Sequence, residues 1–298
     1  MKKLSIAILS LLLLTGCTDA VAKLKDSNTV LFSVGSTNVT KGELYSYMAS
    51  SGGSAAISDA STKIAKIEIE VTDDMRASAE ETLEAYKSYY GDTFTKHLEQ
   101  IGMTEEEYVE ENLIASQLAA QLPNKYVESN FDSFASAYSP IKAIVINFPS
   151  KEDADAAISE LKSDDSDVKA IIEAHNSTSS ADPTVYTIDS TVLDSVARTV
   201  LNSSSAEDGW VQVENSDGST YTVLKVIDNV PANFKEEAIA AIANITTIQE
   251  QSTQYWFSKY NFHIYDKNVY DDVKANYSNY LVQDLDLNIE NNTETESE

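Results

Sequence analysis

Few side chains in this sequence have the types and spacing that catalysis or metal binding needs. Cys17 is the one cysteine, and the three histidines, His97, His175 and His263, are too far apart to ligate a metal from a single helix. Carboxylates cluster between residues 105 and 111, where their oxygens could bind a metal or transfer protons. They also fit the solvated face of a capped helix, which is the interpretation we favour. No Ser-His-Asp spacing of a catalytic triad stands out. Since neither the cysteine, the histidines nor the carboxylates form a recognisable ligand set, we expect no metal and no cofactor.

The net charge excludes one class of partner. The 298-residue chain carries 48 acidic and 21 basic side chains, which gives a formal charge of −27. A surface this acidic repels phosphate, so nucleic acid is not expected as a partner. The length allows a sizeable core and two or more domains.

The position of Cys17 predicts where the protein is found. Residues 1–16 contain two lysines followed by an apolar run from Leu4 to Leu14, as in a secretory signal peptide. The sequence Leu-Thr-Gly-Cys at 14–17 resembles the bacterial lipobox, in which the signal is cut before the cysteine and the thiol carries diacylglycerol. That resemblance implies lipidation of Cys17, a polar tether over 17–27, and anchoring at the extracytoplasmic face of the cell membrane.

Capping signals predict helices in the first half of the chain. Thr40 with Glu43 three residues later marks a helix start, and Leu44, Tyr47 and Met48 share one face of that helix.

Further helices follow from the same kind of signal. Thr72 begins a segment that runs to Tyr90 and is ended by Gly91, and a second helix follows. Thr104 with Glu107 begins the next one. The stretch 52–70 fits either a helix or a short strand. We expect consecutive antiparallel helices in one layer.

The pattern changes at Pro140. Residues 141–148 form a continuous apolar run that is typical of a buried central strand. Two helices, a strand, a third helix and a hairpin with its turn at 215–218 are predicted after it. The order β-α-α-β-α-β-β describes a compact α+β domain, and a helix returns over 234–262. The acidic end of the chain, 283–298, is predicted to be disordered.

Five short motifs carry a resemblance to a known family. They are Val39–Tyr45, Tyr89–Phe94, Gly102–Tyr108, Pro140–Ala143 and Thr220–Val226. In this order, behind a lipobox, they resemble the PrsA-type foldase lipoproteins of Gram-positive bacteria, whose relatives include the periplasmic chaperone SurA. The resemblance implies an α+β fold with a helical chaperone lobe, built from 28–138 and 230–282, and an inserted parvulin-like domain over 139–229.

The sequence departs from that family where an isomerase needs its catalytic groups. An active parvulin has one histidine in its first strand and one in its last strand, and the matching positions here are Val145 and Thr222. The family's Gly-Gly-Asp-Leu-Gly loop is replaced by residues 179–184, which contain no glycine. His175 lies nearby in sequence, but at a predicted helix end, where it suits the helix dipole. We expect a parvulin-like fold without prolyl isomerase activity, and an active isomerase that uses other residues is the alternative.

The resemblance also implies partners. They are unfolded or newly secreted proteins and, through the lipid anchor, the membrane; a homodimer is a further option. An aromatic cluster near the end of the last predicted helix supplies candidate client-binding residues, namely Tyr255, Trp256, Tyr260 and Phe262, although such stripes are more often core. A solute-binding lipoprotein is a distant alternative, disfavoured because no repeated βα units appear.

Overall fold

The structure, a computed structural model, describes residues 24–163 and 166–283. Cys17 and the tail from 284 onwards lie outside the described residues. Contacts divide the described residues into two compact units, one made of residues 24–119 and 253–283 and the other of the described residues between 120 and 252. Within the described ranges, no helix is both long and apolar enough to cross a membrane.

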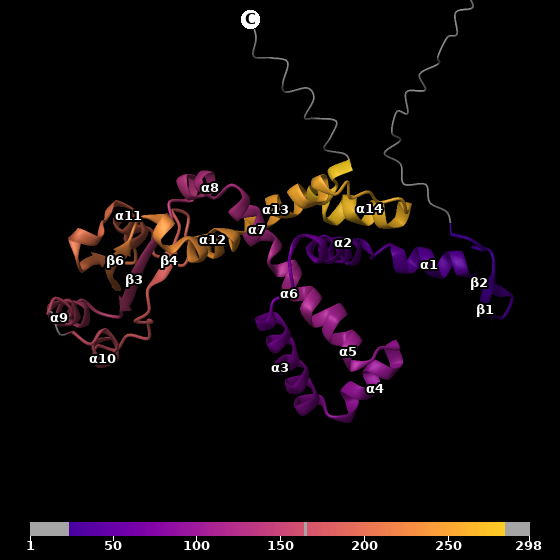
Figure 1. Cartoon of the computed structure of the whole chain (residues 1–298), viewed down its shortest axis with the longest axis horizontal. Helices are drawn as coiled ribbons and strands as arrows, with labels where there is room; N and C mark the ends of the chain where they lie inside the picture. The colour runs from indigo at the N-terminus through magenta and orange to yellow at the C-terminus, as the bar shows by residue number, and fades with distance from the viewer. Residues whose placement is uncertain (1–23, 164–165, 284–298) are drawn as a thin grey trace, which may run out of the picture. The chain divides into compact units, whose positions relative to one another are not determined.

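The first unit is helical apart from a hairpin at its start (Figure 1). Before the second unit its elements are β1 (Val30–Val34), β2 (Thr37–Thr40), α1 (Lys41–Ala49), α2 (Gly53–Glu68), α3 (Asp73–Tyr90), α4 (Asp92–Ile101), α5 (Glu105–Tyr108), a π-helical turn (Val109–Ile114) and α6 (Ala115–Ala120). After the second unit come α13 (Thr246–Lys259), α14 (Lys267–Asn276) and a 3-10 turn (Ser278–Tyr280). The chain passes from one unit to the other within α6 and within α13.

Capping fixes where these helices begin, as the sequence predicts. The Thr40 hydroxyl accepts the N–H of Glu43 at 3.2 Å, and the Glu43 carboxylate accepts the N–H of Thr40 at 2.8 Å. Thr104 and Glu107 form the same reciprocal pair at 3.1 and 2.8 Å. At the end of α3, Gly91 has a φ of 52°, which glycine adopts without strain. The capping predictions at these three places are confirmed.

Other parts of the first unit differ from expectation or are decided by the structure. The ambiguous stretch after residue 52 forms a helix, α2. The helix that begins after Thr104 contains a π-helical turn at Val109–Ile114, which no sequence pattern indicated. Before α1 the chain forms a two-stranded hairpin, because β1 pairs antiparallel with β2.

Helix α14 approaches α2 so closely that a glycine is required between them. The N–H of Gly53 donates to Asp272 Oδ2 at 2.7 Å. A Cβ at position 53 would lie 2.7 Å from that oxygen and 2.9 Å from a methyl carbon of Val273. Around this contact, Val273, Ile264 and Tyr270 form a buried cluster. The N-terminal and C-terminal segments of the first unit are therefore packed on each other.

The second unit surrounds a four-stranded sheet. Its elements are α7 (Leu122–Ser129), α8 (Phe131–Tyr138), β3 (Ile141–Phe148), α9 (Lys151–Leu161), α10 (Val168–Ala174), β4 (Thr184–Tyr186), α11 (Ser195–Ser203), a 3-10 turn (Ala206–Asp208), β5 (Val211–Glu214), β6 (Tyr221–Asp228), a 3-10 turn (Pro231–Phe234) and α12 (Lys235–Ala243). The predicted order β-α-α-β-α-β-β is confirmed between β3 and β6. The helix predicted over 234–262 is divided, since α12 and α13 are separated at Asn244 and Ile245.

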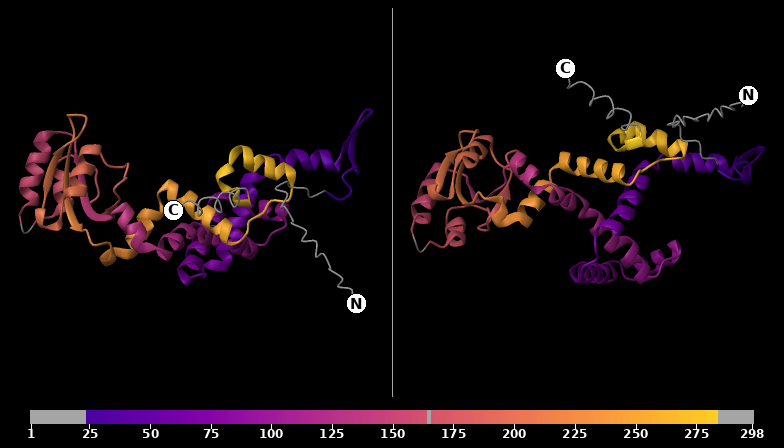
Figure 2. Two further views of the ribbon diagram at one scale, coloured as in Figure 1. Left: turned by 90° about the horizontal axis from the view of Figure 1, so that it is seen from above. Right: turned by 45° about the horizontal axis from the view of Figure 1, so that its top comes forward.

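All neighbouring strands of this sheet run antiparallel, in the order β4-β3-β6-β5. One face carries Ile144, Ile146 and Phe148, which pack with α9 and α10. The other face carries Ala143 and Val145, which pack with α11. The views of Figure 2 show helices on both faces of the sheet. The sheet is thus the central layer of a three-layer domain.

The compact unit is wider than the segment 139–229. Helices α7, α8 and α12 share a buried cluster that includes Val127, Phe131, Ala238 and Ile242. The contacts therefore place α7, α8 and α12 in the same unit as the sheet, whereas the family resemblance implies that they belong to the helical lobe.

Candidate functional site

Val145 and Thr222 lie on the same face of the sheet as diagonal neighbours. In the pair of β3 and β6, Val145 is opposite Leu224 and Thr222 is opposite Asn147. Because side chains alternate across a sheet and opposite residues share a face, all four point to the same side. Diagonal neighbours are within reach of long or aromatic side chains. The register therefore brings together the two positions that match the parvulin histidines.

Helix α11 fills the space over Val145. Ala197 and Leu201 of this helix join Val145, Val213 and Leu224 in one buried cluster. Val145 is 8% exposed and Leu201 is completely buried. This part of the face is an apolar core, since none of these five buried residues has a polar side chain, and the partly buried Tyr186 packs at its border.

Asp194 holds α11 over the sheet. Its Oδ1 accepts the N–H of Val196 at 2.8 Å, which caps the helix, and the N–H of Ser216 in the β5–β6 turn at 3.2 Å. The hydroxyl of Ser216 also donates to this carboxylate. These hydrogen bonds, that of the Ser216 hydroxyl foremost, hold the pKa of Asp194 below its usual value. One carboxylate thus ties the start of the helix to the hairpin.

Thr222 belongs to a small polar cluster next to this core. Its hydroxyl lies 2.8 Å from Asn147 Oδ1 and 2.8 Å from Asn215 Oδ1, and the residue is 1% exposed. The amide of Asn215 in turn donates to the Thr220 hydroxyl at 3.0 Å. Hydroxyl and amide groups do not change protonation near neutral pH, so this cluster supplies no general acid or base. It satisfies buried polar groups where a catalytic pair would stand.

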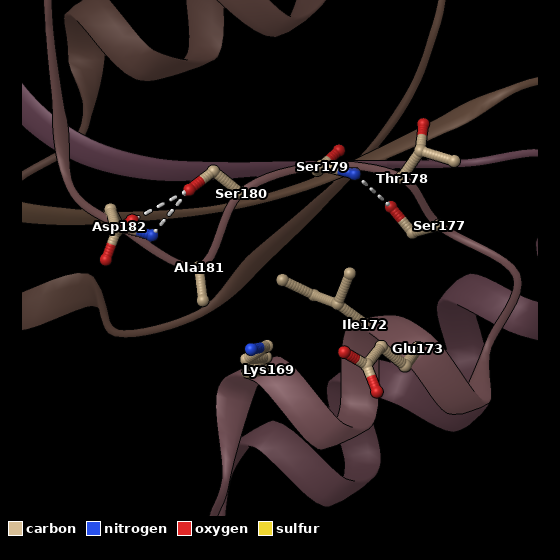
Figure 3. A pocket seen from close by; sticks show the side chains of 9 residues that line it. All are labelled: Lys169, Ile172, Glu173, Ser177, Thr178, Ser179, Ser180, Ala181 and Asp182. Atoms are coloured by element: carbon tan, nitrogen blue, oxygen red, sulfur yellow. Dashed lines mark hydrogen bonds between the residues drawn. The ribbon is translucent and has the colours of Figure 1, made fainter.

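The segment that replaces the glycine loop lines a pocket of about 460 Å³ with α10 (Figure 3). Lys169, Ile172 and Glu173 face residues 177–182 across it. Ile172 packs with Ile146, on the sheet face opposite to that of Val145. The pocket is therefore separate from the positions of the family's histidines.

The serine hydroxyls of this loop are engaged within the fold. Ser179 Oγ accepts the N–H of Asn147 at 2.9 Å, which attaches the loop to β3. Ser180 Oγ accepts the N–H of Asp182 at 3.0 Å, and Ser177 Oγ accepts the N–H of Ser179 at 3.2 Å. Such local bonds stabilise turns. Ser180 Oγ also donates to Asp182 Oδ2 at 3.2 Å, which closes the same local turn. No histidine lines the pocket with these serines, so the loop has no Ser-His pair of the kind that activates a hydroxyl.

His175 occupies the C-cap of α10, as the sequence predicts. Its Nε2 lies 3.0 Å from Glu160 Oε1, and its side chain is 16% exposed. The imidazole links α10 to α9 and lies at the negative end of a helix dipole. The geometry gives it a structural role.

Several carboxylates between 105 and 111 take part in a helix cap or in ion pairs. Glu107 closes the capping box, and Glu110 pairs with Arg76 at 2.6 Å. Glu105 pairs with Lys87 at 3.0 Å. Within the described residues, no group of three or more His, Cys, Asp or Glu could hold a metal ion.

Two of the four aromatic candidates for client binding are turned inward. Trp256 is 2% exposed, and Phe262 packs on Phe257 with ring centroids 4.3 Å apart. Helix α13 ends at Lys259, and the N–H of Phe262 returns to the carbonyl of Phe257 at 2.8 Å while Asn261 adopts a φ of 51°. This helix end packs the partly buried Phe262 on Phe257, so Trp256 and Phe262 leave little surface for a client, and their role in client binding stays a prediction.

The other two aromatic candidates lie nearer the surface. Tyr260 donates its hydroxyl to Glu68 Oε1 at 2.6 Å and is half-buried. Tyr255 is 40% exposed and is the most accessible of the four. A single exposed tyrosine is too small an area to hold an unfolded chain.

A larger number of exposed apolar side chains lies at the start of the first unit, on β1 and α1, and the sequence patterns did not predict that they are exposed. We call this set the hairpin surface, and it comprises the exposed apolar residues Val30, Leu31, Phe32, Val34, Leu44, Tyr47 and Met48. Every residue of β1 is exposed. In α1 the buried contact is made by Ala49, and Tyr45 donates to Asp266 of the C-terminal segment at 3.0 Å. The face of α1 with Leu44, Tyr47 and Met48 therefore points outward, although apolar residues at this spacing usually mark a buried face.

Comparison with known proteins finds similar solved structures. No family model matches the chain, and no curated protein matches it significantly. Structural neighbours include PrsA proteins of several Gram-positive bacteria. The foldase protein PrsA from Streptococcus pneumoniae has 16% sequence identity over 85% of this chain and 100% of its own, with a TM-score of 0.44. PrsA from Bacillus subtilis has 17% identity over 83% and 99% of the two chains, with a TM-score of 0.36. The peptidylprolyl isomerase PrsA from Bacillus cereus has 16% identity over 84% and 98%, with a TM-score of 0.41. All three TM-scores are below 0.5, a level of likeness that establishes neither a shared fold nor a shared activity.

Proposed function

We propose that this protein is a foldase of the holdase kind, which binds unfolded secreted proteins outside the cytoplasm and does not catalyse prolyl isomerisation. The observation that carries the proposal is the hairpin surface. Seven large apolar side chains exposed on one short segment are what a protein needs to bind apolar stretches of other chains. Apolar burial is non-directional, so such binding accepts many client sequences.

The sheet face supports the part of the proposal that concerns catalysis. Rotation about a peptide bond has a barrier of about 18–20 kcal/mol. An isomerase lowers it with polar groups aimed at the twisted amide in a water-free pocket. Here Val145 lies under α11, and Thr222 is occupied by its neighbours Asn147 and Asn215. A proline ring finds neither space nor a free polar group at this place.

The holdase activity is tested with point variants of the full mature chain. The triple variant Phe32→Ser, Val34→Ser, Tyr47→Ser removes apolar area from the hairpin surface without touching a buried residue. We expect it to lose most of the suppression of aggregation that the wild type gives to a chemically denatured model protein, measured by light scattering.

The matched control takes three exposed apolar residues of the second unit. The variant Ile188→Ser, Val192→Ser, Val230→Ser should suppress aggregation like the wild type. Equal loss in both triple variants, with far-UV circular dichroism unchanged, would show that the hairpin surface is not the binding surface.

Absence of isomerase activity is tested with a protease-coupled assay on a Xaa-Pro tetrapeptide. We expect the uncatalysed rate at micromolar protein. Catalysis that disappears in His175→Gln or Asp182→Asn would show that the domain uses another set of residues.

The location is part of the same proposal. Lipidation at Cys17 would hold the protein at the outer face of the cell membrane through acyl chains. Membrane fractionation of Cys17→Ala should show release of the protein or retention of its signal peptide. Unchanged membrane association of that variant would contradict the anchor.

A further inference from the structure

The first unit contains an aromatic pocket that the hairpin surface does not include. It has a volume of about 410 Å³ and is lined by residues of α3, α4 and α5. Its lining consists of Tyr86, Tyr90, Thr93, Phe94, His97 and Tyr108. Four of these six side chains are aromatic rings without a charge, and no lysine or arginine is among them.

The rings stand at steep angles to one another. Phe94 is 5% exposed and lies at the centre, with its ring 6.1 Å from that of Tyr86 and 5.3 Å from that of Tyr108. Tyr90 is 6.1 Å from Tyr86 and is 52% exposed. The interplanar angles of these three pairs lie between 57° and 81°. Rings tilted in this way form a cup that presents both faces and edges to an incoming group.

The three phenol groups converge in this cup. The pKa of Tyr108 is raised, first by burial and second by the nearby phenol groups of Tyr86 and Tyr90. The Tyr108 phenol is therefore held in its neutral form, and the three tyrosines contribute electron-rich rings and oxygen lone pairs but no positive charge.

The surroundings of the cup are strongly acidic. Residues 73–120 contain twelve Asp and Glu side chains against three Lys and Arg. Two of these three cations are already paired, Arg76 with Glu110 and Lys87 with Glu84 and Glu105. The field over this segment attracts cations and repels acidic chain segments.

We propose that the cup binds the cationic side chains of extended polypeptides, with arginine preferred. A guanidinium or ammonium group over the faces of several rings is held by cation–π attraction, and the acidic field raises its local concentration. Arginine fits better than lysine because its planar group stacks on rings and is more weakly hydrated. This inference rests on the proposed function and adds a second, charge-selective element to client binding.

The test uses fluorescently labelled, unstructured peptides that differ at one position. The position carries arginine, its neutral analogue citrulline, lysine or phenylalanine, and binding to the mature full-length chain is measured by fluorescence anisotropy. We expect the citrulline peptide to bind about tenfold more weakly than the arginine peptide, with lysine between them.

Variants decide whether the cup or the acidic surface makes the distinction. Tyr90→Leu keeps an apolar side chain but removes an exposed ring, and it should reduce the ratio of arginine to citrulline affinity to near one. The control Tyr265→Leu removes an exposed ring outside the pocket and should leave the ratio unchanged. A ratio that is unaffected by Tyr90→Leu, or strongest binding by the phenylalanine peptide, would overturn the proposal.

The two proposals fail in distinguishable ways. If the wild type suppresses aggregation but binds the arginine and citrulline peptides equally, only the cup proposal is wrong. If the tenfold ratio is found and aggregation is not suppressed, the cup binds cations and the holdase function is wrong.

Discussion

Replacing Thr222 with valine tests whether the Thr222 hydroxyl has a structural role, namely to stabilise the buried polar cluster of the second unit. The variant keeps the shape of the side chain, so no cavity forms, and it removes the hydroxyl that lies 2.8 Å from both Asn147 and Asn215. Asn147 is exposed and can turn to water, whereas Asn215 is 9% exposed and loses a partner that water replaces poorly. One buried acceptor without a partner costs about 1–3 kcal/mol. The added methyl group returns about 0.8 kcal/mol through burial. We expect the free energy of unfolding of the second unit to fall by about 1 kcal/mol.

The two tryptophans allow this loss to be measured in the right unit. Trp210 lies beside β5 in the second unit, and Trp256 lies in the first unit. In a Trp256→Phe background, urea unfolding followed by tryptophan fluorescence reports the second unit alone. The control Thr191→Val removes an exposed hydroxyl and should change stability by less than about 0.5 kcal/mol. Equal or greater stability of Thr222→Val would refute the assignment of a structural role to this hydroxyl.

Three further predictions follow from contacts described in the two units. Gly53→Ala should lower the free energy of unfolding of the first unit by about 1–3 kcal/mol, because the added Cβ meets Asp272 and Val273. The control Ser54→Ala changes an exposed neighbour and should leave this free energy nearly unchanged. Both are measured by urea unfolding followed by Trp256 fluorescence in a Trp210→Phe background. Backbone N–H groups of Thr220 and Ser219 lower the pKa of Asp217 from 3.8 to about 2, so its carboxylate stabilises the hairpin turn above pH 4 and this stability is lost as the pH falls through 2. The stability difference between wild type and Asp217→Asn should therefore shrink between pH 4 and pH 2, and a constant difference would contradict this account. Asn261→Ala should lower the melting temperature of the first unit, since alanine in the left-handed region costs about 1–2 kcal/mol.

Local sequence signals were sufficient to predict the helices and strands that are determined by residues close together in the sequence. The capping boxes at Thr40 and Thr104 involve residues three positions apart, and the apolar run 141–148 identifies its own strand. The order of elements in the second unit follows from such signals. The diagonal placement of Val145 and Thr222 needed the register of two strands that are distant in sequence.

Features that depend on what packs against an element could not be predicted in this way. The spacing of Leu44, Tyr47 and Met48 shows that α1 has an apolar face, but periodicity does not say whether anything covers that face. Trp256 and Phe262 have the residue types of a binding surface, yet Trp256 is buried and Phe262 is partly buried against a core cluster. Their burial depends on a left-handed residue, Asn261, and on segments far away in the sequence.

The composition of the first unit from two chain segments determines the order in which the protein can fold. A chain that crosses a membrane emerges with its N-terminus first. Helix α2 cannot pack on α14 until residue 276 has crossed the membrane. The second unit is complete earlier, once residue 252 has crossed. The second unit can therefore fold while the first is still incomplete, and during that interval α2 exposes the apolar residues that α14 later covers. If this protein is exported as we propose, it is itself an emerging chain that exposes apolar residues before its first unit is complete.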